Sequence, residues 1–500
     1  MAEGEVREKG PFWPTGSSFA FVPSVGQPRP GRRARSLVAV LALAGACVAF
    51  PVTCFLVLGA LLWLQALLKV VACSHRPGHA EFYDPPVWPV FTVLVPLHNE
   101  QKAVPALVRA LLAIDYPSEC LDIRILCEAD DPETLDAVAD ALVGTPNHIQ
   151  RVSIPVSQPR TKPKALRVGL EGAPGEIVTV YDAEDAPHPQ QLRAAARALH
   201  ADTRLVAVQA PLSVDNLAPG WITRQFAVEY AALFHVWIPW LAEHGLVLPL
   251  GGTSNHIRRD ALERAGGWDP FNVTEDADLS YRLALMDPRP SGGRIGWIPE
   301  GTSEEAVASF RAWRGQRSRW LKGYAQTVFV HLFTPASWGQ PHRVRRQAAM
   351  LATVGLTLLT ALLHVPALIG VGLAWAFGHP PSPPVAMLGG MFYLSGIGVS
   401  WLGAKRAGVP VRALDLVTVP LYWALMAWPA WVGFLELFYR PHYWNKTAHG
   451  VSARRRDAAC QTSPALHSSK ASAASLSALS SPHGVSGVTS PSGVATATAV

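Results

Sequence analysis

The chain is short of charged residues: Asp, Glu, Lys and Arg make up 16% of its 500 residues, against about 25% in an ordinary soluble protein. Together with a hydrophobic fraction of 49%, this shortage excludes a wholly disordered chain and indicates extensive contact with lipid. The six cysteines form no C-x-x-C pair, which argues against a cysteine-based zinc site. The formal net charge of +6 is too small to indicate a nucleic-acid partner.

The chain opens on polar residues and then turns apolar. Residues 1–35 carry Gly, Pro and a basic cluster at 32–35, which predicts a flexible basic tail. Residues 36–73 are predicted as an N-terminal transmembrane segment, because no charge occurs from Leu37 to Leu68. One straight helix of that length would reach about 48 Å, against about 30 Å of hydrocarbon. The run therefore tilts, bends near Pro51 or forms a hairpin of two short spans, and basic residues on both sides favour the hairpin.

Residues 85–335 have a different pattern, which predicts an α/β domain. Short apolar runs alternate with segments of helical spacing. The strand candidates are 90–96, 123–127, 177–181 and 205–209, with helices at 104–114, 135–142 and 190–200 between them. Strands separated by helices form a mostly parallel sheet flanked by helices. Ligands of such sheets lie beyond the carboxyl ends of the strands.

Residues 345–440 return to an apolar composition and are predicted as C-terminal transmembrane or interfacial helices. Nearly uncharged stretches cover 347–377, 385–402 and 414–438. Pro420 and Pro429 interrupt the last stretch, which either spans the bilayer or lies in its interface. Residues 457–500 are Ser, Ala, Thr, Val and Gly with little charge, which predicts a disordered low-complexity tail.

Acidic residues gather where two predicted strands end. Residues 128–131 are Glu-Ala-Asp-Asp, and residues 182–185 are Asp-Ala-Glu-Asp. Carboxylates that converge in a dry site repel one another, and a divalent cation removes that penalty. Mg²⁺ and Mn²⁺ take such oxygen ligands and bridge them to substrate phosphates. A solvated acidic loop or a helix N-cap is the alternative for either cluster alone.

Three shorter segments lie between and after these clusters. Residues 162–164 are Lys-Pro-Lys, where a lysine meets a diphosphate or belongs to a charged surface loop. Residues 251–256 are a Gly-rich turn, and glycine permits close approach of the backbone to a ligand. Thr274 and Glu275 fit an N-cap with an acid in the first helical turn. Asp276 is then left for a role as general base.

Residues 316–320 are Gln-Arg-Ser-Arg-Trp on a helix shortly before the C-terminal apolar block. An Arg and a Trp at such a place can snorkel at a membrane interface. In an active site, the same residues give a flat aromatic face to a sugar ring and a fixed cation to a leaving diphosphate.

The order of these motifs is more specific than any one of them. An acidic cluster, an Asp-x-acid at a strand end, a Glu-Asp pair and a Q-x-x-R-W segment lie between two hydrophobic blocks. In this order, and with residues 95–100 similar to an opening strand-to-loop motif, the chain resembles the membrane-embedded family 2 glycosyltransferases. That group contains cellulose synthase, curdlan synthase and related bacterial processive β-polysaccharide synthases. The resemblance implies a cytoplasmic GT-A-like catalytic domain inserted between transmembrane helices.

The resemblance also implies roles for individual residues. Asp276 is the expected general base, and Asp182 and Glu184 are the expected ligands of Mg²⁺ or Mn²⁺. Glu184 stands where the family usually has Asp, so Asp185 is a possible substitute ligand. The donor nucleotide and its diphosphate are expected at Glu100, Glu128, Asp130, Lys164 and Arg319, with Asp131 as the alternative to Asp130. The acceptor is expected at Glu275, Gln316 and Trp320.

The resemblance finally implies an inverting enzyme that moves a sugar from UDP-glucose or a related UDP-sugar to a growing polysaccharide at the membrane. UDP-N-acetylglucosamine and GDP-mannose are alternative donors. A single-sugar transferase acting on a polyprenyl or diacylglycerol lipid is an alternative enzyme, and a membrane transporter or scaffold is the non-enzymatic alternative. The expected location is the inner, cytoplasmic membrane, crossed several times. The expected partners are the bilayer, the nucleotide-sugar and a polysaccharide or glycolipid acceptor, with no nucleic acid.

Overall fold

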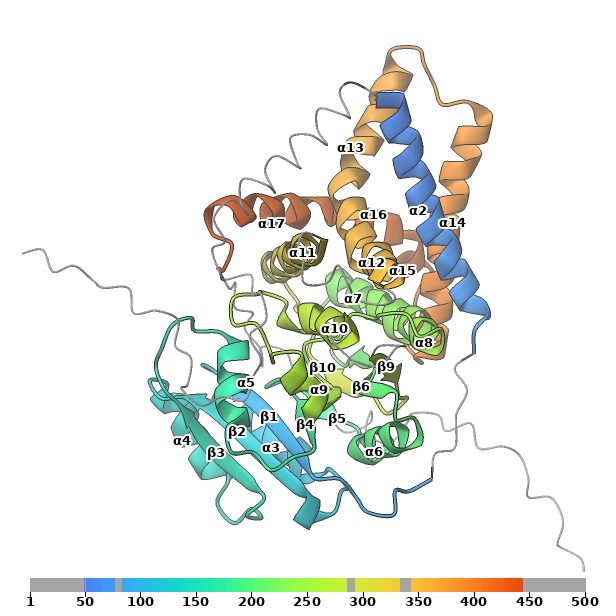
Figure 1. Ribbon diagram of the computed structural model, residues 1–500. Coiled ribbons are helices and arrows are strands. Elements are labelled where there is room, and N and C mark those ends of the chain that lie inside the picture. The colour runs from blue at the N-terminus through green and yellow to red at the C-terminus, as the bar shows by residue number, and fades with distance from the viewer. Residues whose placement is uncertain (1–48, 50, 77–82, 286–292, 333–342, 444–500) are drawn as a thin grey trace, which may run out of the picture. The chain divides into compact units, whose positions relative to one another are not determined.

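A computed structural model of the protein describes residues 49, 51–76, 83–285, 293–332 and 343–443 (Figure 1). The predicted tails at 1–35 and 457–500 lie outside the described residues, as does most of the first part of the segment 36–73. The described residues all belong to one compact unit.

The middle of the chain builds a seven-stranded sheet of order β3-β2-β1-β4-β8-β6-β9. Its strands are β1 (Phe91–Leu97), β2 (Leu121–Glu128), β3 (Ile149–Ile154), β4 (Ile177–Val180), β6 (Leu205–Gln209), β8 (Asn255–Arg258) and β9 (Arg294–Trp297). Neighbouring strands are parallel except for β8, which runs antiparallel between β4 and β6. The predicted mostly parallel sheet is therefore confirmed.

The four predicted strands fall on β1, β2, β4 and β6. Their nearly continuous apolar runs are typical of parallel strands whose two faces are both covered. The predicted turn at 251–256 is wrong in its second half, because Asn255 and His256 begin β8. His256 is buried, and its Nδ1 lies 2.7 Å from Thr179 Oγ1. The sequence around His256 is polar, and its burial comes from the strands on either side.

Helices flank this sheet on both faces. The segments in chain order are α3 (Val104–Leu112), α4 (Pro132–Ala141), α5 (Lys162–Leu170), α6 (Gln191–Ala201), α7 (Trp221–Ala232), the π-helical η2 (Leu233–Trp237), α8 (Ile238–Glu243), α9 (Arg259–Arg264), α10 (Glu275–Leu285) and α11 (Phe310–Leu332). A second, small sheet has the order β5-β10-β7. Its strands are β5 (Ala186–Pro187), β10 (Thr302–Glu304) and β7 (Leu212–Val214).

Three described stretches are long and apolar enough to cross a membrane: Val344–Ala376, Pro383–Arg406 and Val419–Tyr439. They contain α12 (Arg343–Met350), η4 (Leu351–Gly355), α13 (Leu356–Ala376), α14 (Pro383–Arg406), α16 (Val419–Leu425) and α17 (Ala427–Tyr439). Helix α2 (Pro51–Ser74) lies beside α13 and α14 (Figure 1). The described part of α2 runs from Pro51 to Ser74, so the bend considered near Pro51 falls at the edge of the described residues and stays a prediction.

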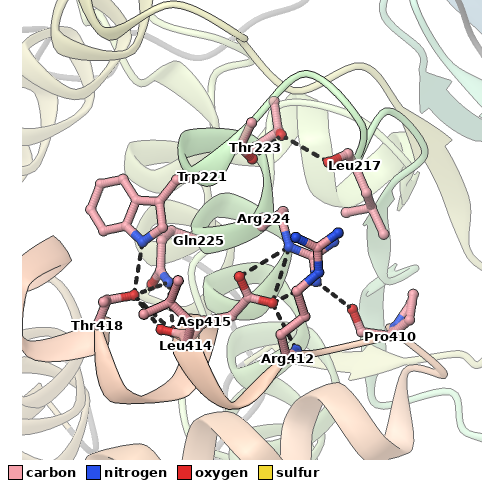
Figure 2. A network of polar contacts seen from close by, with 11 residues as sticks. Leu217, Trp221, Thr223, Arg224, Gln225, Pro410, Arg412, Leu414, Asp415 and Thr418 are labelled. Carbon is pink, nitrogen blue, oxygen red and sulfur yellow. Dashed lines mark hydrogen bonds and ion pairs between the residues drawn. The ribbon is translucent and has the colours of Figure 1, made fainter.

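Helix α7 joins the α/β part of the chain to the C-terminal helices. Arg224 on α7 donates hydrogen bonds to both carboxylate oxygens of Asp415 on α15 (Ala413–Val417) at 3.0 Å (Figure 2). Beside this pair, Trp221 Nε1 donates to Thr418 Oγ1 at 2.8 Å. The predicted stretch 414–438 thus starts with a buried carboxylate paired to α7 and divides into three short helices.

Candidate active site

One cavity of about 450 Å³ lies at the carboxyl ends of β1, β2 and β4, and α10 and α11 complete its wall. Nine of the predicted site residues line it: Glu100, Glu128, Asp182, Glu184, Glu275, Asp276, Gln316, Arg319 and Trp320. The fold therefore brings carboxylates, a guanidinium group and an indole from distant parts of the sequence to one space.

The acidic wall follows from the sheet order. Because β1 lies between β2 and β4, the residues that follow these parallel strands meet at one edge. Glu128 is the last residue of β2, and Asp182 comes two residues after β4. Glu100 comes after β1, and its backbone N–H donates to Thr134 Oγ1 at 3.1 Å. Three separate strand ends thus supply three carboxyl groups to the cavity.

The first lysine of the Lys-Pro-Lys motif, Lys162, also lines the cavity and is the first residue of α5. Its Nζ forms an ion pair with the Asp182 carboxylate and donates to the carbonyl oxygen of Gly252 at 2.7 Å. Burial opposes the charge of Lys162, but the facing carboxylates, Asp182 first, raise its pKa above the ordinary lysine value. The Lys-Pro-Lys motif does not indicate which of its two lysines meets the diphosphate, and the resemblance implies Lys164.

Two predicted residues do not line the cavity. Lys164 Nζ donates to Glu128 Oε2 at 2.9 Å and to Pro155 O at 3.2 Å, so it neutralises a buried carboxylate. Asp130 forms an ion pair with Arg160, which itself lines the cavity. Two residues turn a helix by about 200°, so only one lysine of the motif faces the cavity. The predicted diphosphate contact of Lys164 and the predicted nucleotide contact of Asp130 stay predictions.

Charged groups converge in front of Gly252. A Cβ atom added to Gly252 would lie 3.5 Å from Asp276 Oδ2, 3.6 Å from Lys162 Nζ and 3.9 Å from Asp182 Oδ2. Glycine therefore keeps open the space that these three groups share. Two residues on, Ser254 has a φ of 54°, a strained conformation of the kind that clusters at functional sites.

Asp276 and Glu275 occupy the first turn of α10. Burial raises the pKa of Asp276 above its ordinary value, although backbone hydrogen bonds and the charge of Lys162 partly offset the rise. Burial, followed by the negative charge of Asp276, raises the pKa of Glu275 to about 7. Carboxyl groups with raised pKa values are suited to accept a proton near neutral pH.

Helix α11 reaches the start of α10 through a glycine. A Cβ atom on Gly323 would lie 2.7 Å from Thr274 Cβ, so a larger residue would push the two helices apart. Gln316, Trp320 and Tyr324 recur every four residues along α11, share one face of the helix and line the cavity. The close contact at Gly323 thus sets the distance between this face and Asp276.

Trp320 is supported by other aromatic and cationic groups. Its ring lies within 10° of parallel to that of Tyr230, with centroids 6.3 Å apart. The Arg317 guanidinium carbon lies 4.3 Å from the Trp320 ring centroid, and Arg317 pairs with Glu229 at 2.7 Å. Tyr230 and Tyr324 line the cavity but carried no prediction, because neither belongs to one of the motifs on which the sequence analysis relied.

The residues present fit a divalent cation that draws further ligands from a substrate. Asp182 and Glu184 both line the cavity and offer the oxygen donors that Mg²⁺ and Mn²⁺ prefer. Asp185, the possible substitute ligand, does not line it; its Oδ2 accepts hydrogen bonds from Asp182 N at 2.6 Å and from Thr253 Oγ1. Across the described ranges, no three His, Cys, Asp or Glu side chains are grouped so that they could hold a metal ion.

Comparison with known proteins gives a family match over the same part of the chain. Residues 86–323 match the family described as glycosyltransferase like family 2. The β-monoglucosyldiacylglycerol synthase of a Synechocystis species is 24% identical over 379 residues, which is 73% of this chain and 76% of that protein. Glucomannan 4-β-mannosyltransferase 7 of Arabidopsis thaliana is 26% identical over 249 residues, which is 48% of this chain and 44% of that protein.

A solved structure has the same fold. The mannosyltransferase PcManGT from Pyrobaculum calidifontis, solved in complex with GDP-Man and Mn²⁺, aligns with a TM-score of 0.55. The alignment covers 77% of this chain and 97% of the other, with 19% identity. The expected GT-A-like fold is therefore confirmed, and at this identity the likeness concerns the fold alone.

Proposed function

We propose that this chain, whose residues 86–323 match the family described as glycosyltransferase like family 2, moves a hexose from a nucleoside-diphosphate sugar to an acceptor hydroxyl group at a membrane. The observation that carries the proposal is the single cavity shared by Asp182, Lys162, Asp276 and Trp320. The non-enzymatic alternative, a transporter or scaffold, is not retained, because the description of the matched family and the names of the relatives favour an enzyme.

The donor diphosphate is assigned to the acidic and cationic side of the cavity. Asp182 and Glu184 would hold Mg²⁺ or Mn²⁺, which when bound neutralises the charge of the diphosphate. Lys162 replaces Lys164 in our assignment, because Lys162 faces the cavity. Lys162 and Arg319 then stabilise the negative charge that develops on the leaving diphosphate. UDP-glucose or a related UDP-sugar is the expected donor, with UDP-N-acetylglucosamine and GDP-mannose as alternatives.

Asp276 is assigned as the general base of an inverting transfer. Its carboxylate accepts the proton of an acceptor hydroxyl group, and the resulting oxygen nucleophile attacks the anomeric carbon. The bond between that carbon and the diphosphate oxygen breaks on the opposite face, so the electron pair leaves with the nucleoside diphosphate. An α-linked donor gives a β-linked product. The raised pKa of Asp276 supports this role, because it increases the basicity of the carboxylate.

A growing polysaccharide is the first candidate for the acceptor. Gln316, Trp320 and Tyr324 form a polar and aromatic strip along one face of α11, and aromatic faces suit the apolar faces of sugar rings. Glu275 lies beside this strip. The glucomannan mannosyltransferase among the relatives supports the same candidate by its name.

A lipid acceptor is the second candidate, and a different part of the wall favours it. An aliphatic and aromatic surface continues from Tyr230 along η2 and the loop before β8, formed by Leu212, Leu233, Phe234, Ile238, Pro249 and Leu250. Contact of a hydrocarbon chain with such a surface removes apolar area from water and strengthens binding, whereas a glycan has little apolar area to bury there. The glucosyldiacylglycerol synthase among the relatives supports this candidate by its name.

The proposed location is the cytoplasmic membrane, with the catalytic domain of residues 85–335 in the cytoplasm. Segments 36–73 and 345–440 are proposed as its membrane-bound flanks. The three candidate spans and the exposed apolar side chains of α2, α13 and α14 support this arrangement, since such side chains need lipid around them.

Membranes that contain the protein test the function directly. They are incubated with labelled UDP-glucose, UDP-N-acetylglucosamine or GDP-mannose and with Mg²⁺ or Mn²⁺, and the products are separated into lipid extract and polymer. Membranes with the Asp276→Asn variant are the matched control. With wild-type membranes we expect label from one donor to appear in one product class, and with Asp276→Asn membranes we expect no labelled product. If wild-type membranes transferred sugar from none of the donors, the proposal would be refuted.

A further inference from the structure

Glu304 is a carboxyl group in the cavity wall that none of the assigned roles uses. It ends β10, the middle strand of the small sheet. Tyr230 and the negative charges of Asp185, Glu184 and Asp182 all act electrostatically on this carboxyl group. Glu304 thus lines the same cavity as Asp182 and Glu184 of the acidic wall and the aromatic Tyr230.

These neighbours belong to opposite sides of the reaction centre. Asp182 and Glu184 are on the diphosphate side, whereas Tyr230 is parallel to Trp320 within 10° and belongs to the acceptor side. In an inverting transfer, the moved sugar lies between the departing diphosphate and the incoming hydroxyl group. The carboxyl group of Glu304 therefore borders the space that this sugar has to occupy.

A third metal ligand is the competing role for Glu304. Within the part of the chain that the structure describes, no three acidic, histidine or cysteine side chains are grouped as a metal site. Tyr230, which acts on Glu304, also lines the cavity and is stacked with Trp320 on the acceptor side. Contact with the sugar accounts for this position better than contact with a metal.

We propose that Glu304 forms a hydrogen bond with a hydroxyl group of the transferred hexose and thereby selects among epimeric donor sugars. The inference rests on the proposed function and adds a specificity residue to its site. Epimers differ in the direction of one hydroxyl group, so one fixed partner can distinguish them. A buried polar group that loses its partner discriminates more strongly than an apolar pocket does.

Calorimetry on the full-length protein in detergent with Mn²⁺ tests the proposal. Dissociation constants are measured for UDP, UDP-glucose and UDP-galactose, and for GDP, GDP-mannose and GDP-glucose. In Glu304→Leu we expect the ratio between the preferred donor and its epimer to fall about tenfold, with an unchanged constant for the free nucleotide. Glu304→Gln keeps a hydrogen-bonding group and should retain most of the ratio. The matched control Glu305→Gln alters a neighbour that does not line the cavity and should keep the wild-type ratio.

Glu304→Asp is the second variant, because it retains the carboxyl group but withdraws it by one methylene. An unchanged epimer ratio in both Glu304→Leu and Glu304→Asp, in protein that binds the free nucleotide, would overturn the inference. A uniform loss of affinity for every nucleotide would do the same, by assigning Glu304 a structural role. If electron paramagnetic resonance shows that the Glu304 variants bind Mn²⁺ more weakly, Glu304 is a metal ligand and the inference is overturned. If the wild-type protein binds no nucleotide at all, the proposed function itself is wrong. This result is distinct from the outcomes above, in which the protein binds the free nucleotide and only the role of Glu304 is at stake.

Discussion

The ammonium nitrogen of Lys162 lies 2.7 Å from the carbonyl oxygen of Gly252. The bond joins the first residue of α5 to the loop before β8, and the same ammonium group pairs with Asp182. A cation held between a backbone oxygen and a carboxylate is in place before a substrate arrives. Such preorganised charge stabilises a developing anion without the cost of reorganisation during the reaction.

The two lysines of the Lys-Pro-Lys motif should differ when each is changed to Met. Lys162→Met is expected to lower kcat/KM about 100-fold, with little effect on the melting temperature. Lys164→Met leaves the buried Glu128 carboxylate without its cation, which costs about 3–5 kcal/mol of stability. Thermal unfolding and initial rates on the same preparations measure both effects. If Lys164→Met lowered kcat/KM and Lys162→Met lowered stability instead, the diphosphate contact would be assigned to Lys164.

Replacement of Asp276 by Asn should remove transfer but not donor binding. The amide has a similar shape but cannot accept the proton, so the rate should fall about 10²–10⁴-fold. Nucleotide affinity from calorimetry should stay within a factor of three of the wild-type value, because the diphosphate is assigned to other residues. Normal turnover by Asp276→Asn would show that another group is the base.

The pH dependence of transfer should reflect the raised pKa values in the first turn of α10. Asp276 works as the base when it is deprotonated, and burial raises its pKa above the ordinary value, so the rate is expected to decline with falling pH at a higher pH than an ordinary carboxyl group would give. Lys162 lowers the pKa of Asp276 by its charge. In Lys162→Met the acid limb of the profile should therefore move to higher pH. A limb near pH 4, the value for ordinary carboxyl groups, would contradict this electrostatic picture.

Gly252→Ala tests whether the space among Asp276, Lys162 and Asp182 receives the substrate. The added methyl group makes ordinary van der Waals contacts of 3.5–3.9 Å with these groups, so the melting temperature should not change. It occupies room in the reaction centre, and kcat/KM for the donor should fall about tenfold or more. Gly251→Ala, which points at Leu212 Cδ1 at 3.3 Å, is the neighbouring comparison and should affect the donor less.

Removal of divalent cations with a chelator should stop transfer, and Mg²⁺ or Mn²⁺ should restore it. Asp182→Asn should need a higher cation concentration for half-maximal rate, because one oxygen ligand is weakened. Electron paramagnetic resonance in the presence of the nucleotide measures Mn²⁺ binding directly and gives an independent test of the metal ligands. Full activity after exhaustive chelation would exclude the metal assignment.

Much of the architecture could be read from local patterns. The four strands at the core of the prediction match β1, β2, β4 and β6 because their burial on both faces requires unbroken apolar runs. The strands β3, β5, β7, β8, β9 and β10 were missed, since β3 and β8 contain several polar residues and the other four have only two to four residues each. Their strand character comes from the neighbours with which they pair, and no propensity in their own residues indicates it.

The sequence by itself determined which chemical groups this protein possesses and in which order: carboxylates at strand ends, a Glu-Asp pair, a Q-x-x-R-W helix and apolar flanks. Only the tertiary structure decided which of them meet. Lys162 rather than Lys164 faces the cavity because of its place on the turn of α5, and α11 stands close to Asp276 because Gly323 packs against Thr274. Glu304 and Tyr230 enter the site through the small sheet and α7. A linear pattern records residue types and spacing, whereas helix rotation and backbone approach depend on contacts between segments far apart in the chain.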